Sequence, residues 1–123
     1  MTVYQILGWV TVVLFVLLVV KAPLKSINEK HKNKGLTKLN SMFTKYHKYF
    51  GILIVISAIS HGILTGANLF SINPGSLALV GLIFTSVFGV LIKMVRNKSI
   101  LVIHKALAVA TLALIVSHVL LQL

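Results

Sequence analysis

The charged residues of this 123-residue chain are confined to two windows. Residues 21–48 hold eight Lys and Glu29, and residues 93–105 hold three Lys and Arg96. Together they account for the whole formal net charge of +11. The rest of the chain is uncharged apart from its termini, so it lacks the charged side chains that cover the surface of a soluble domain.

The composition supports a membrane protein and excludes several soluble classes. Hydrophobic residues make up 58% of the chain and charged residues 11%, with a mean hydropathy of +1.01, whereas soluble domains have about 25% charged residues. A nucleic-acid-binding domain or a disordered basic tail would be far more polar, so we expect no nucleic-acid partner. The chain has no Cys and one carboxylate residue, which excludes disulfides, iron–sulfur clusters, covalently attached haem and paired-carboxylate catalysis.

Four apolar segments cover approximately residues 3–20, 47–70, 76–95 and 100–121. Each has about 18 to 24 residues, and a helix of about 20 residues spans the ~30 Å hydrocarbon core of a bilayer. Backbone groups in lipid must be satisfied internally, and the segments lack the two-residue alternation of barrel strands. The sequence therefore predicts an all-α membrane protein, a single transmembrane domain over residues 1–123 built as a four-helix bundle.

The two basic windows predict how the helices are oriented. Basic loops of about residues 21–46 and 96–99 would join the first helix to the second and the third to the fourth, whereas the loop around residues 71–75 is uncharged. Because cytoplasmic loops are enriched in Lys and Arg, we expect both basic loops in the cytoplasm and both chain termini outside. The expected location is the cytoplasmic (inner) membrane, with the chain crossing it several times in contact with lipid.

The first basic loop admits two interpretations. Apolar residues recur in it at three- and four-residue steps: Leu36, Leu39, Met42, Phe43 and Tyr46. This spacing is typical of a short interfacial amphipathic helix running into the second membrane helix, and a plain charged loop that only fixes topology is an equal alternative. Residues 25–35 are expected to be flexible and solvated. The loop could dock an acidic electron donor, although contact with anionic lipid alone would explain its charge.

Four of the five His residues lie in the membrane segments, where an ionisable side chain is costly and indicates a functional site. His47 and His61 are 14 residues apart in the second segment, and His104 and His118 are 14 apart in the fourth. Fourteen helical steps return each pair to the same helix face, with a rise of about 21 Å. The second and fourth helices would run parallel, so His47 would lie level with His104 and His61 with His118.

The same short pattern occurs twice, at an offset of 57 residues. Eleven residues separate His47-Lys48 from Ser60-His61, and eleven residues separate His104-Lys105 from Ser117-His118. This repetition indicates a duplicated helical hairpin. The unequal lengths of the two basic loops argue against an unmodified copy.

Two stacked sites, each with two His, would suit two non-covalent b-type haems. A haem iron accepts two axial imidazoles from opposite sides, and an apolar bundle interior encloses the ring. Zinc would need further ligands at each level, and no Cys, Asp or Glu is available in the segments. A proton relay would normally include carboxylates. A relay, another metal role and ordinary packing of the histidines stay open as alternatives.

Glycines and cations near the histidines would support haem binding. Gly51 and Gly62 would leave room for a macrocycle close to the helix backbone, although small residues equally promote helix packing. Three cations lie in the sequence near His47 and His104, the inner level: Lys48, Lys105 and Arg96. They could pair with the propionates of an inner haem, or act as topology anchors. The outer site has no cation, so an outer haem would use neutral donors.

Two helices that each carry His residues 14 apart resemble the bis-haem core of respiratory cytochrome b and of the ferric reductase-like transmembrane domain. Residues 47–51 (HKYFG) are similar to the start of a ligand helix in ferric reductase-like proteins, and His104-Lys105 resembles the start of the second. The resemblance covers residues 47–66 and 100–121. Ferric reductase-like domains usually have six helices, so the four-helix arrangement looks more like the first four helices of cytochrome b.

The resemblance implies that His47 and His104 bind the iron of an inner haem and that His61 and His118 bind the iron of an outer haem. The implied function is transmembrane electron transfer from a cytoplasmic flavoprotein or iron–sulfur donor to a quinone, ferric iron or an external acceptor. We expect an electron-transfer subunit of a larger membrane oxidoreductase, or a core that forms a homo-oligomer, rather than a self-contained enzyme. The alternative is a small transporter or structural membrane subunit that uses its intramembrane His as a proton relay.

Overall fold

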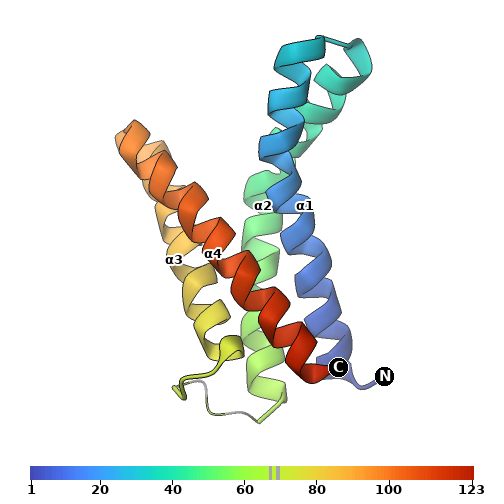
Figure 1. The fold of residues 1–123 in the computed structure, drawn as a ribbon, viewed down its shortest axis with the longest axis vertical. Helices are drawn as coiled ribbons and strands as arrows, with labels where there is room; N and C mark the ends of the chain where they lie inside the picture. Colours follow the sequence, from blue (N-terminus) through green and yellow to red (C-terminus); the bar gives the residue numbers. More distant parts are fainter. Residues whose placement is uncertain (67, 69) are drawn as a thin grey trace.

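A computed structural model of the protein describes residues 1–66, 68 and 70–123 (Figure 1). Its helices are α1 (Val3–His31), α2 (Lys34–Leu64), α3 (Pro74–Val95) and α4 (Lys98–Gln122). All four are long and apolar enough to cross a membrane. The expected all-α, four-helix membrane fold is therefore confirmed.

Asn residues begin three of the helices. The side chains of Asn33, Asn73 and Asn97 accept hydrogen bonds from backbone N–H groups in the first turns of α2, α3 and α4, as Asn commonly does at this position. Lys32 and Arg96 adopt a left-handed backbone, with φ of 42° and 52°, and end α1 and α3. The two basic connections are therefore two-residue turns.

The first basic connection is much shorter than the loop expected over residues 21–46. α1 continues to His31 and α2 starts at Lys34, so both helices extend past their apolar segments as a basic helical hairpin. The sequence prediction ended the first helix where charge begins, yet Lys is a good helix former and Leu24 is buried in the extension. Residues 36–46 are helical and run directly into the membrane segment, as the first of the two interpretations of this loop requires.

The second apolar segment ends earlier than expected. α2 stops at Leu64, and Gly66 turns the chain with a φ of 67°, which suits Gly because it has no Cβ. Residues 67 and 69, which the sequence prediction included in this segment, lie outside the described residues. The ends of α3 and α4 agree with the prediction within the one or two residues by which helix ends are ordinarily uncertain.

The helices pair into two antiparallel hairpins, a first hairpin of α1 and α2 and a second hairpin of α3 and α4. In Figure 1 the hairpins lie together near the chain termini and diverge toward the basic turns. Phe15, Ile54 and Leu82, from three different helices, form the buried core where the hairpins meet. Many large apolar side chains outside the core, such as Ile56 and Val109, are exposed and suit a lipid environment.

Candidate functional site

Two pairs of His rings face each other between the hairpins. His47 of α2 lies opposite His104 of α4, and His61 of α2 lies opposite His118 of α4. The ring centroids are 6.3 Å apart in each pair, and the ring planes are inclined at 72° and 80°. The structure thus brings together the residues that the sequence pairs. We call His47 and His104 the inner pair, at the end with the basic turns, and His61 and His118 the outer pair.

Backbone carbonyls of the neighbouring helices hold two of these rings. His61 Nδ1 lies 2.6 Å from the carbonyl oxygen of Tyr4 on α1, and His104 Nδ1 lies 2.7 Å from that of Thr85 on α3. Because a carbonyl only accepts hydrogen bonds, each Nδ1 is the donor and each Nε2 keeps its lone pair. An imidazole fixed in this way is prepared to bind a metal through Nε2.

Glycines let three of the rings lie directly against a helix backbone. A Cβ atom at Gly8 would lie 2.9 Å from His61 Cε1, and one at Gly75 would lie 2.9 Å from His118 Cε1. A Cβ at Gly89 would lie 3.1 Å from His104 Cε1. The distances at Gly8 and Gly75 are too short for a carbon–carbon contact, so Gly at these two positions makes the ring positions possible. The distance at Gly89 is tight, so the ring of His104 would have to shift slightly to accept a Cβ there. Neither Gly8 nor Gly75 is among the candidates that the sequence alone indicates.

The two hairpins repeat one arrangement. Gly8 follows the carbonyl of Tyr4 by four residues, and Gly89 follows the carbonyl of Thr85 by four residues. In both cases the carbonyl binds a His Nδ1 while the Gly one turn later contacts the same ring. The 57-residue repeat in α2 and α4 therefore has a counterpart in the helices that support them, and the spacing from Tyr4 to Gly8 and from Thr85 to Gly89 is the signal that could have found it.

His47 departs from this arrangement. The contact of Gly8 with His61 and the 2.9 Å hydrogen bond between Thr11 and Ser57 set the antiparallel register of α1 and α2. Continued along the helices, this register places Lys21 and Ala22 opposite His47. The Nδ1 of His47 is buried and has no hydrogen-bond partner among the described residues. A charged side chain and a methyl group thus replace the Gly found beside the other three rings.

The three cations expected near the inner pair have no confirmed role. Lys48, Arg96 and Lys105 are all exposed, and the backbone of Arg96 ends α3. Lys21 is half-buried, and the positive charges that act on it are those of Lys25, Lys93 and Lys105. Lys105 is one of the three cations expected here.

The predicted Gly51 and Gly62 have no confirmed role in the site. Both lie half-buried on α2. A Cβ added at Gly51 would meet nothing within 4 Å, so no packing contact among the described side chains requires a Gly there. Gly81, by contrast, packs on Thr111, since an added Cβ would lie 2.6 Å from the Thr111 hydroxyl oxygen.

The region between the two His levels is packed and largely apolar. Ile54 and Thr111, which are 57 residues apart, are both fully buried there. The Thr111 hydroxyl lies 3.4 Å from that of Thr85, and other buried hydroxyls bind carbonyls of the same hairpin. Within the described part of the chain, these bonds do not form a chain that links the inner pair to the outer pair.

The chemistry of the site rests on paired imidazoles alone. Among residues 1–66, 68 and 70–123, no group of three or more His, Cys, Asp or Glu could hold a metal ion, so a tetrahedral structural zinc site has too few ligands. Two imidazoles at one level can provide two opposed ligands and no more. Comparison of the chain with models of known families, with curated proteins and with solved structures found no match.

Proposed function

We propose that the protein is a four-helix membrane cytochrome b that carries single electrons across the membrane. In this proposal one b-type haem is held between His47 and His104 and a second between His61 and His118. The observation that carries it is the 6.3 Å separation of the ring centroids, which is the same in both pairs.

This separation fits two imidazoles bound to one metal from opposite sides. A metal–imidazole bond is about 2.0 Å long, and a five-membered ring with bonds near 1.35 Å has its centre about 1.15 Å from each ring atom. Two imidazoles that bind one metal ion from opposite sides would therefore have centroids about 6.3 Å apart. A direct hydrogen bond of about 2.9 Å between two ring nitrogens would instead bring the centroids to about 5.2 Å.

The surroundings of the rings support the same interpretation. His61 and His104 donate from Nδ1 to backbone carbonyls, which leaves Nε2 as the available ligand atom. The residues between the levels are apolar or have their hydroxyls bonded within a hairpin, as suits a site that excludes water. A bound haem iron would supply a one-electron couple at each level.

The proposal includes an orientation and a context. With the basic turns in the cytoplasm, the inner pair faces a cytoplasmic flavoprotein or iron–sulfur donor, and the outer pair faces a quinone, ferric iron or an external acceptor. The two levels are about 21 Å apart along α2 and α4. The chain would act as the electron-transfer subunit of a larger oxidoreductase.

A proton relay is the weaker alternative for these histidines. The membrane segments offer no carboxylate, and the hydroxyls described between the levels are bonded within their own hairpins. A relay needs donors and acceptors that follow one another at hydrogen-bond distance. The two proposals predict different spectra, because only the cytochrome is coloured.

The test is a reduced-minus-oxidised spectrum of the purified full chain and of four variants. His47→Ala, His61→Ala, His104→Ala and His118→Ala should each lose one haem and keep the other. His31→Ala is the matched control, because His31 is exposed at the end of α1 and belongs to neither pair. Retention of both haems in all four variants would contradict the ligand assignment, and a colourless wild-type chain would contradict the function.

A further inference from the structure

Lys21 is directed toward the bundle although it carries a charge. It follows Leu18 by three residues and Leu14 by seven, so the three share one face of α1. Leu14 and Leu18 pack against the buried core, and Lys21 is only half-exposed. The helix register also places Lys21 opposite His47 on α2. Lys21 therefore lies at the level of the inner pair, on the face of α1 that is turned toward the bundle.

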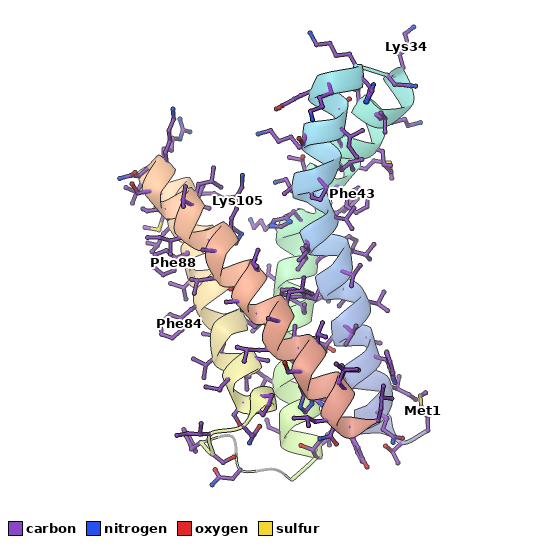
Figure 2. All side chains as sticks on the ribbon, viewed as in Figure 1. Met1, Lys34, Phe43, Phe84, Phe88 and Lys105 are labelled. Carbon is purple, nitrogen blue, oxygen red and sulfur yellow. The ribbon has the colours of Figure 1, made fainter. Side chains whose placement is uncertain are left out.

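Two further cations come to the same place from the second hairpin. Lys93 follows Gly89 by one helical turn on α3, and Gly89 contacts the ring of His104. Lys105 directly follows His104 on α4, in the upper part of that helix in Figure 2. Both cations are within electrostatic reach of Lys21. Lys21 is half-buried, whereas Lys93 and Lys105 are exposed. Three Lys from three helices thus lie near one another at the end of the inner pair that carries the basic turns.

The chain offers this cluster no counter-charge. Glu29 is its one acidic side chain. It is exposed and lies two helical turns beyond Lys21 on the extension of α1. No ion pair is formed by Lys21, Lys93 or Lys105 in the described structure. Cations that lie near one another repel, so an anion with more than one charge would stabilise this arrangement.

The outer pair has no such cluster. No Lys or Arg occurs in residues 1–20, 49–92 or 106–123, which include both of its histidines and the loop between α2 and α3. The cation cluster is therefore specific to the inner level and is not a general property of the His pairs.

We propose that Lys21, Lys93 and Lys105 form a binding site for the two propionate carboxylates of a porphyrin held between His47 and His104. The inference rests on the proposed function and adds to it the residues that recognise the carboxylates. Lysine ammonium groups donate short, charge-assisted hydrogen bonds to such oxygens. A macrocycle bound there would have its carboxylates toward the basic turns. The phosphate of an anionic lipid is the other source of anionic oxygen at this depth.

The experiment compares haem with haem dimethyl ester, which has the same ring and iron but no carboxylate. The apo form of His61→Ala, which keeps only the inner pair, is reconstituted in nanodiscs of zwitterionic lipid and titrated with each compound. The chain with all three lysines should bind haem at least about tenfold more tightly than the ester, given the strength of charged hydrogen bonds. In Lys21→Gln/Lys93→Gln/Lys105→Gln this preference should disappear.

The matched control is Lys38→Gln/Lys48→Gln/Lys98→Gln, which removes the same charge from exposed residues at the same end. It should keep the preference. A preference that survives in the first triple variant, or that disappears equally in both, would overturn the site. A preference abolished by phosphatidylglycerol in the nanodisc would assign the lysines to lipid phosphate and overturn it as well. Failure of the wild-type chain to bind either compound would overturn the proposed function itself. Should His61→Ala fail to fold, the wild-type chain is titrated with each compound instead. Its affinity for haem and for the ester is then compared with that of the triple lysine variant, in which only the inner site is altered.

Discussion

His61 on α2 donates a hydrogen bond from its Nδ1 to the backbone carbonyl of Tyr4 on α1, over 2.6 Å. Gly8, one turn further along α1, lies directly under the same ring. The carbonyl fixes which nitrogen carries the proton, and the Gly fixes how close the ring can come to the backbone. One turn of α1 therefore determines both the tautomer and the position of a candidate ligand on another helix.

Gly8→Ala should loosen the outer site without unfolding the chain. The new Cβ would lie 2.9 Å from His61 Cε1, so the ring must move, whereas Ala itself favours a helix by about 1 kcal/mol over Gly. We expect loss or a spectral shift of the outer haem, with the inner haem unchanged, in a difference spectrum. Gly51→Ala is the control, because an added Cβ there meets nothing within 4 Å. An unchanged spectrum in Gly8→Ala would contradict this role.

Gly81→Ala should destabilise the second hairpin, and a second substitution should rescue it. An added Cβ would lie 2.6 Å from the hydroxyl oxygen of Thr111, which is fully buried, so the packing around Thr111 would have to shift. We expect a loss on the order of 1–3 kcal/mol, as for other overpacked sites, in unfolding by denaturant in detergent. Thr111→Ala removes that oxygen, and hydrogen bonds between membrane helices are worth only about 0.6 kcal/mol. The double variant should therefore be more stable than Gly81→Ala, and strictly additive losses would show that the two residues do not clash.

The two sites should differ in reduction potential. Positive charge near an iron favours its reduced state. Lys21, Lys93 and Lys105 lie at the end of the inner pair, whereas the segments that carry the outer pair contain no Lys or Arg. A redox titration should show two steps, the higher one from the inner site. Lys21→Gln should lower the higher midpoint by an amount on the order of tens of millivolts, the effect of one partly screened charge. A fall in the lower midpoint instead would place Lys21 at the wrong haem.

Trypsin should reach the chain from one side of the membrane only. Lys32 and Lys34 flank the turn between α1 and α2 and are exposed, and Figure 2 shows Lys34 at the tip of the first hairpin, far from Met1. α1 is about 44 Å long, which exceeds the ~30 Å hydrocarbon core. With the basic turns in the cytoplasm, inverted vesicles should be cleaved near these lysines and right-side-out vesicles should not. Cleavage in right-side-out vesicles alone would reverse the orientation.

The sequence was sufficient for the number of helices and for the pairing of the histidines, because both depend on periodicity. Residues 14 apart share a helix face wherever the helix is straight, so His47 and His61 were assigned to one face of α2 without knowledge of packing. The ends of the helices were harder to predict, since Lys residues such as Lys25 and Lys30 are good helix formers as well as loop residues. Charge alone therefore misplaced the end of α1.

The supports of the rings could not be predicted, because they depend on the register between helices. Gly8 and Gly75 have a role in the site because the rings of His61 and His118 lie against them. Each of these contacts joins two helices, so neither can be inferred from one segment of the sequence. The sequence predicts a loop at Lys21, whereas the fold places it on the core-facing side of α1. The spacing from Tyr4 to Gly8, repeated from Thr85 to Gly89, becomes a signal only once the hairpins are compared.

The central claim is that each pair of imidazoles binds one haem. The most direct measurement is the number of haem b groups per chain in the purified wild-type protein, obtained from the pyridine haemochrome and a quantitative amino-acid analysis. The predicted result is two haems per chain. One haem per chain would contradict the claim for one of the two pairs, although both pairs have ring centroids 6.3 Å apart. A colourless chain would contradict the claim for both pairs.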